Sequence, residues 1–113
     1  GHNPPVLFNN ETRQVIHLHS QCVGIGMIDE IPPVEPEVLY IAETSKIVCY
    51  TDGLSDLKGG DGREILTSEI VKHIKNRKPV EQNLRKMLKK LGIPDNNPDL
   101  FDDVSIIAAD FIR

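Results

Sequence analysis

Short apolar runs separated by turn residues make up the first half of the chain, and their length predicts β-strands. The runs span residues 6–8, 14–18, 38–41 and 47–50. Polar residues 9–12 separate the first two runs, so we expect a β-hairpin there. Residues 43–45 predict a turn before the last run. The prolines within 31–36 predict a surface connection, because proline has no backbone N–H to donate to a central strand.

The second half changes to a helical period. One helix is predicted to begin near Thr67 or Ser68, either of which could cap it, with Ile70, Val71 and Ile74 on its buried side. A clearer helix is predicted from about Pro79 to Leu91, where apolar residues recur at helical spacing. These residues are Val80, Leu84, Met87, Leu88 and Leu91.

Proline and glycine mark the ends of this second helix. Pro79 suits its start, and Gly92 with Pro94 suits its stop. A last apolar run from 104 to about 112 predicts a final strand. Strands, then two helices, then one strand predict an α+β fold with a mostly antiparallel sheet.

Composition narrows the function classes. The chain has 113 residues, enough for one domain, and a net charge of −4, which argues against a nucleic-acid surface. No apolar stretch reaches the roughly 18–20 residues of a membrane span, and no signal segment opens the chain. Cys22 and Cys49 have apolar neighbours and indicate core thiols in a reducing compartment, although a disulfide or metal pair stays open. We therefore expect a cytoplasmic location.

Two acidic motifs are the strongest chemical signal. Asp52 follows the run 47–50 with one residue between them, and Asp102 lies just before the run 104–109. Carboxylates at the ends of core strands are costly to desolvate without a partner, and a divalent cation is a natural one. Taken singly, each motif is more often a plain turn or a solvated loop end.

Two other clusters are weaker candidates. His17 and His19 share one face of a predicted strand, a spacing that can bind metal, but no third ligand is evident nearby in the sequence. A half-exposed strand is therefore the favoured interpretation, and His73 is interpreted as a surface or boundary residue. The basic side chains of the second helix predict a solvated face, with partner docking as the alternative. They are Arg85, Lys86, Lys89 and Lys90.

Four motifs in order resemble one family. They are Gly-His-Asn-Pro-Pro at 1–5 with the apolar residues after it, Val-Gly-Ile-Gly at 23–26, Tyr-Thr-Asp-Gly at 50–53, and Asp-Asp-Val-Ser at 102–105. Together they resemble the metal-dependent serine/threonine phosphatases of type 2C, in the bacterial branch typified by the SpoIIE and RsbU sporulation and stress-response phosphatases. The resemblance implies an αββα sandwich of two stacked sheets flanked by helices.

The resemblance also implies a site and a reaction. Asp52 and Asp102 would be ligands of a dinuclear Mg²⁺ or Mn²⁺ site. Gly53, Asp56 and Asp103 are secondary candidates: Asp56 matches an acidic position of the family whose role stays open, and Asp103 would either support the ligands or lie at the surface. Two such ions activate water and neutralise charge on the leaving oxygen. The implied substrate is a phosphoserine or phosphothreonine protein of a signalling or sigma-factor pathway, typically an anti-sigma-factor antagonist.

The chain departs from the family pattern in two places. Residues 1–113 resemble only the C-terminal half of the catalytic domain, so we expect weak or absent metal binding and little activity from this chain alone. Residues 43–46 replace the usual Pro-Gly-Asp, which is expected to change only a turn. The alternative is a non-catalytic interaction module or degenerate phosphatase. Self-association through exposed strand edges or an apolar sheet face is expected.

Overall fold

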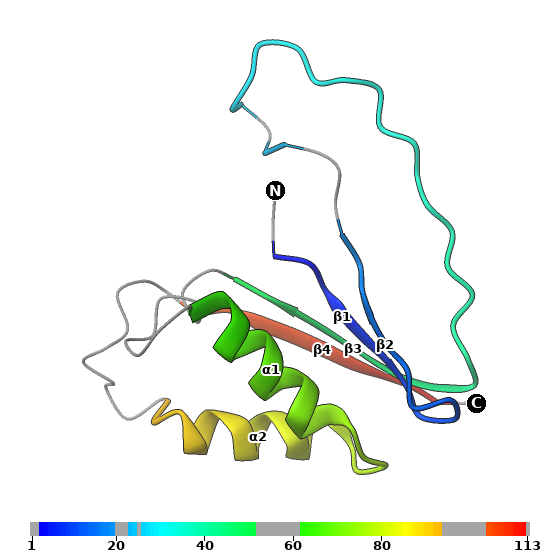
Figure 1. Ribbon diagram of the computed structural model, residues 1–113, viewed down its shortest axis with the longest axis vertical. Helices are drawn as coiled ribbons and strands as arrows, with labels where there is room; N and C mark the ends of the chain where they lie inside the picture. Colours follow the sequence, from blue (N-terminus) through cyan, green and yellow to red (C-terminus); the bar gives the residue numbers. More distant parts are fainter. Residues whose placement is uncertain (1–2, 20–22, 25, 52–61, 94–103, 113) are drawn as a thin grey trace.

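The computed structural model describes residues 3–19, 23–24, 26–51, 62–93 and 104–112, with the backbone alone for 62–66. One antiparallel sheet and two helices form the described fold, which confirms the α+β prediction (Figure 1). The elements are β1 (Val6–Asn9), β2 (Val15–His17), β3 (Thr44–Tyr50), α1 (Gly62–Ile74), α2 (Val80–Lys90) and β4 (Ile106–Ile112). The strand order across the sheet is β2-β1-β3-β4.

The register of the sheet separates two faces. Val6 of β1 pairs with Val48 of β3, which pairs in turn with Ala108 of β4. In the same way Lys46 of β3 lies between Phe8 and Asp110. Because side chains alternate along a strand, all of these residues point to one face of the sheet.

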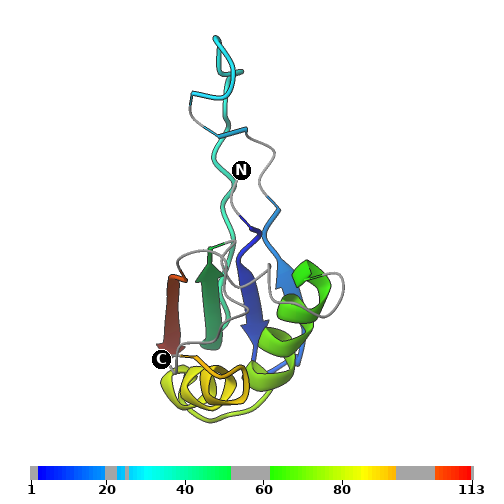
Figure 2. The same ribbon diagram turned by 90° about the vertical axis from the view of Figure 1, so that its left-hand side faces the viewer.

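Both helices cover that face. Figure 2 shows α1 lying on the β1 and β2 side of the sheet and α2 lying toward β4. The core between the layers consists of buried side chains from the two central strands, β1 and β3, and from both helices. They are Val6, Phe8, Val48, Tyr50, Ile70, Ile74, Val80 and Met87. The predicted buried side of α1 is confirmed at Ile70 and Ile74, and Val71 packs beside the cluster.

The predicted hairpin is confirmed by its turn. β1 and β2 pair antiparallel, and the Asn9 N–H donates to the Gln14 carbonyl at 3.0 Å. The Asn9 side chain accepts the N–H groups of Glu11 and Thr12, which is the local bonding that favours asparagine in turns. Arg13 takes the left-handed conformation, with φ 63°.

The prediction for the second helix is confirmed within about one residue at each end. Pro79 immediately precedes α2, and Gly92 follows its C-terminal cap with φ 71°. The Gly92 N–H donates to Lys89 O and the Ile93 N–H to Leu88 O, a paired bonding pattern that closes a helix. Only a residue tolerant of positive φ fits position 92 without strain.

The first helix begins earlier than predicted. α1 starts at Gly62, so Thr67 and Ser68 lie inside it and neither caps its start. The Thr67 hydroxyl instead lies 3.0 Å from the Tyr50 hydroxyl of β3. Threonine therefore contributes a tertiary contact here, which a local capping rule cannot anticipate. In the same half, β4 begins at Ile106, two residues later than expected.

Two predictions for the segment before β3 were wrong. The turn expected at 43–45 is replaced by an earlier start of β3 at Thr44. Residues 38–41, expected to form a strand, have no secondary structure. They feed directly into β3, and both edges of β3 are already paired, with β1 and β4. The apolar run at 38–41 therefore cannot pair with β3, the strand nearest to it in the sequence. Residues 31–36 are exposed, as predicted for a surface connection.

Candidate metal centre

The C-terminal end of β3 and the N-terminal end of β4 lie together where the strands leave the sheet. This edge is formed by strand ends and differs from the outer side of an edge strand. Beyond the last pair, Tyr50 with Ile106, the Thr51 N–H donates to the Ser105 carbonyl at 3.0 Å. The Ser105 N–H donates in return to the Thr51 hydroxyl oxygen at 2.9 Å. The two segments that carry the acidic motifs therefore leave the sheet from hydrogen-bonded neighbours.

The predicted site residues themselves lie outside the described part of the chain. They are Asp52, Gly53, Asp56, Asp102 and Asp103. The residues that anchor the edge are described. Tyr50 is buried in the core and reaches α1 through Thr67, while Val104 and Ile106 pack against the core cluster. The edge is thus held by both the sheet and a helix.

The described residues supply no alternative metal site. Among them, no group of three His, Cys, Asp or Glu side chains could hold an ion. His17 and His19 have ring centroids 6.3 Å apart, with His19 exposed and His17 at the end of β2. This arrangement agrees with the interpretation of a half-exposed strand. Carboxylate oxygens, as in the two acidic motifs, are the donor type that Mg²⁺ and Mn²⁺ prefer.

Sequence reasoning missed the most unusual charged residue of the fold. Lys46 was expected in a turn, but it lies in β3 with only 1% of its surface exposed. Its ammonium group donates to Ile74 O (3.2 Å), Asn76 O (2.6 Å) and Asn83 Oδ1 (2.9 Å), with Asn76 Oδ1 also at 3.2 Å. The signal was present in the sequence, because Lys46 alternates with Val48 and Tyr50 on the core face.

Burial dominates the electrostatics of this lysine. Desolvation lowers the Lys46 pKa from its usual 10.5, and the nearby Arg13 charge lowers it further, while Asp110 opposes both. The acceptors come from the end of α1, the connection after it and α2, so one side chain joins β3 to both helices. This position makes Lys46 a structural residue.

Asp110 is the second polar residue at this end of the sheet. It lies opposite Lys46 in the register, and its Oδ2 accepts the Val80 N–H of α2 at 2.8 Å. Pro79 offers no side-chain cap to the helix. A carboxylate from β4 therefore caps α2, which is favourable because the first N–H groups of a helix are unpaired and carry partial positive charge.

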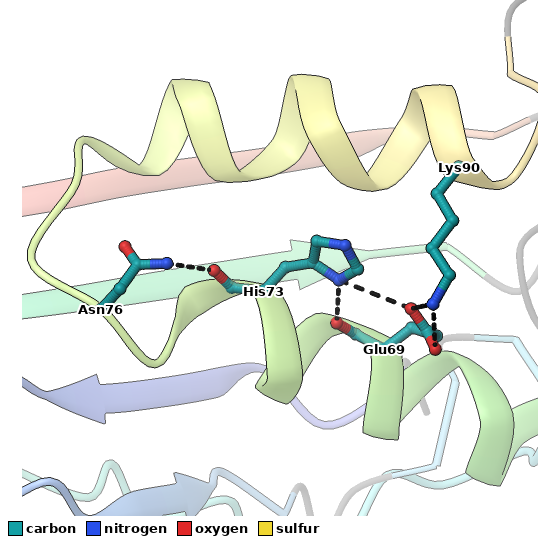
Figure 3. A network of polar contacts seen from close by, with 4 residues as sticks. All are labelled: Glu69, His73, Asn76 and Lys90. Atoms are coloured by element: carbon teal, nitrogen blue, oxygen red, sulfur yellow. Dashed lines mark hydrogen bonds and ion pairs between the residues drawn. The ribbon is translucent and has the colours of Figure 1, made fainter.

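The two helices are joined by a smaller polar network (Figure 3). Glu69 of α1 accepts from Lys90 of α2 through both carboxylate oxygens at 2.9 Å. The Nδ1 atom of His73 lies 2.7 Å from the Glu69 carbonyl oxygen and 3.5 Å from its carboxylate. Lys90 lowers the Glu69 pKa by hydrogen bonding. The His73 side chain is 9% exposed, which agrees with a boundary residue.

A pocket of about 450 Å³ lies at the end of the sheet opposite Thr51. Its walls include the polar residues Lys46 and Asp110. Thr44 and Ile112, at the strand ends beside them, also line it. Lys46 and Asp110 already have hydrogen-bond partners, since Lys46 donates to carbonyl and amide acceptors and Asp110 accepts the Val80 N–H. This pocket is therefore separate from the edge to which the acidic segments attach.

The arrangement defines the class of the protein: an α+β fold with an antiparallel sheet, one helix layer, and two acidic segments attached at one sheet edge. Comparison with protein-family models gives a match over residues 1–112 to the family described as Stage II sporulation protein E (SpoIIE). The match spans nearly the whole chain, so the chain belongs to the SpoIIE family, as the motifs indicated.

Two further comparisons gave no match. No curated protein and no solved structure matched the chain. Neither helix in the described part of the chain is long and apolar enough to cross a membrane.

Proposed function

We propose that the protein to which this chain belongs is a metal-dependent protein serine/threonine phosphatase. One observation carries the proposal: in a chain of the SpoIIE family, Thr51 and Ser105 are hydrogen-bonded at one sheet edge. Asp52 follows Thr51 directly, and Asp102 precedes Ser105 by three residues. Since adjacent Cα atoms are about 3.8 Å apart, both carboxylates attach to the chain within reach of that edge.

The proposal assigns Asp52 and Asp102 as ligands of two Mn²⁺ or Mg²⁺ ions. Bound ions of this kind supply an activated water and neutralise charge on a phosphate ester. The side chains contribute hard oxygen donors and negative charge to hold the cations. Gly53, Asp56 and Asp103 are proposed to support the two ligands.

The substrate and setting are part of the same proposal. By resemblance, the substrate is a phosphoserine or phosphothreonine protein in a signalling or sigma-factor pathway, such as an anti-sigma-factor antagonist, and the location is cytoplasmic. Residues 1–113 would form the C-terminal half of the catalytic domain. Alone, they would hold metal weakly, because a dinuclear centre needs ligands from the other half as well.

The test is Asp52→Asn in the intact protein. Asparagine keeps the size of the side chain but removes its negative charge, so Mn²⁺-dependent phosphate release from a phosphoserine protein should be abolished. Mn²⁺ binding, followed by calorimetry in the absence of substrate, should weaken in parallel. Asp102→Asn should behave in the same way.

Asp29→Asn is the matched control, because it makes the same chemical change at an exposed position outside the two acidic motifs. It should leave both activity and Mn²⁺ binding unchanged. Full turnover by Asp52→Asn would remove this residue from the mechanism. Loss of turnover with intact Mn²⁺ binding would remove it from the ligand set.

A further inference from the structure

A long extended segment of the chain is unusually apolar for its exposure. Residues 28–41, here called the strap, begin far from the sheet and lead back to the start of β3 (Figures 1 and 2). Tyr40 is 99% exposed and Val38 is 77% exposed, and the strap also exposes Leu39 and Ile41. Exposed apolar stretches of this kind mark interaction sites.

The strap also has unused backbone groups. Within the described part of the chain, no hydrogen bond involves any residue from 28 to 41. Its residues 37–41 (Glu-Val-Leu-Tyr-Ile) contain no proline and combine β-branched, aliphatic and aromatic side chains, which suit a strand. The segment cannot pair with the strand it leads into, because both edges of β3 are occupied.

The described sheet offers one suitable edge for such a segment. β4 is the last strand in the sheet order, so its outer backbone groups have no strand beside them among the described residues. Its sequence, Ile-Ile-Ala-Ala-Asp-Phe-Ile, lacks the lysine or proline that commonly protects an edge. Ile107 and Ile112 are 75% and 80% exposed. The opposite edge strand, β2, is only three residues long.

Charge favours the same edge. The strap carries Asp29, Glu30, Glu35 and Glu37 and no basic residue. α2 lies on the β4 side of the sheet, where the Val80 N–H donates to Asp110 (Figure 2). Its exposed Lys86 and Lys89 make no described ion pair. A strand formed by residues 37–41 along β4 would therefore carry the acidic Glu37 near a basic helix.

We propose that the occupant of the β4 edge is the strap of a second copy of this chain. Residues 37–41 of each copy add as a strand to β4 of the other, so the interface is reciprocal and closes as a two-fold dimer. This exchange covers the apolar strap and the apolar edge in one step. It is independent of the proposed phosphatase activity.

The test measures the mass of the 113-residue chain by light scattering after size exclusion, at tens of micromolar. The wild type should be a dimer. Leu39→Pro removes an N–H from the middle of the added strand and should raise the dimer dissociation constant at least about tenfold. Val34→Pro makes the same change outside residues 37–41 and should leave the dimer intact. Circular dichroism checks that each variant is folded.

A mixing experiment identifies the two surfaces. Ile107→Lys places a charge on the β4 edge and should also give a monomer. Leu39→Pro keeps a functional β4, and Ile107→Lys keeps a functional strap. An equimolar mixture of the two should therefore form dimers through one intact junction, although neither variant does so alone.

Three outcomes would overturn the proposal. The first is a monomeric wild type at the same concentration. The second is a dimer that survives Leu39→Pro, which would point to pairing of β4 with β4 instead. The third is a mixture of the two monomeric variants that stays monomeric, because reciprocal exchange requires them to complement each other.

Discussion

The two ends of β3 differ in whether the charged groups near them have partners within the described fold. At the Lys46 end, the ammonium group has its acceptors within the chain, and Asp110 has a helix N–H. At the Thr51 end, the described bonds join backbone and hydroxyl groups of two strand ends, and the acidic residues attach beyond them. The comparison shows that a buried charge is not by itself a sign of function. A charge with internal partners stabilises the fold, whereas carboxylates attached to an anchored edge can serve a ligand.

Lys46→Met is expected to lower the free energy of unfolding more than any other substitution considered for the two ends of β3. Methionine fills similar space but removes the described donor of Asn76 O and Asn83 Oδ1. Ile74 O keeps the Asn76 N–H, and Asn76 Oδ1 keeps the Lys78 N–H and the Asn83 side-chain amide. We expect the free energy of unfolding to fall by about 3 kcal/mol, because buried acceptors then lose water without regaining a hydrogen bond. Chemical denaturation followed by circular dichroism measures the change.

Lys75→Met is the control for this substitution, since Lys75 is exposed. It should change stability by no more than about 0.5 kcal/mol. If both substitutions have equal effects, the interpretation of Lys46 as the residue joining β3 to the helices is wrong.

Asp110→Ala should have the next largest effect. It removes the carboxylate that accepts the Val80 N–H, and loss of such a cap costs about 1 kcal/mol. Asp110→Asn retains an acceptor oxygen and should lose less. The denaturant midpoints of the two variants measure these losses of stability. Equal losses would show that α2 requires the negative charge of Asp110 and not the hydrogen bond.

Thr51→Val tests the other end of β3. It removes the acceptor of the Ser105 N–H but leaves the Thr51 N–H bonded to Ser105. Because this bond is exposed, we expect a loss of only about 0.5 kcal/mol. Hydrogen exchange at the Ser105 amide should speed up locally. A loss as large as that of Lys46→Met would contradict the contrast between the two ends.

The smallest effect is expected from the link between the helices, and it depends on pH. Lys90 lowers the Glu69 pKa below its usual 4.5 in the folded chain. The contribution to stability is therefore present above that value and is lost as the pH falls through the lowered pKa. Wild type should exceed Lys90→Gln in thermal midpoint near neutral pH and converge with it in acid, whereas Lys86→Gln should match wild type throughout. A gap that persists in strong acid would assign the effect of Lys90 to packing.

Local patterns predicted the parts of this fold that local physics determines. The hairpin around Asn9 and the helix between Pro79 and Gly92 depend on neighbouring residues, and both were predicted within a few residues. The start of α1 and the burial of Lys46 depend on partners distant in the sequence. The capping rule therefore placed the start of α1 too late, and a turn was expected where Lys46 lies in β3.

The candidate site divides in the same way. The motifs around Asp52 and Asp102 predicted the family, which the comparison confirmed. The roles of the individual carboxylates remain predictions, since they lie outside the described residues. The strand predicted at 38–41 was wrong. The run has a strand-like composition, but composition cannot show whether a neighbouring strand is open to pair with it.

The cap on α2 has a consequence for how the chain folds during synthesis. Val80 and Asp110 are 30 residues apart, so α2 is synthesised before β4. The helix start then stays uncapped until the last strand pairs with β3. Contacts between residues so far apart slow folding, because the connecting chain must first be ordered. Docking of β4 therefore completes the sheet and the helix layer in a single late step, and a chain stalled before residue 110 should hold α2 only loosely.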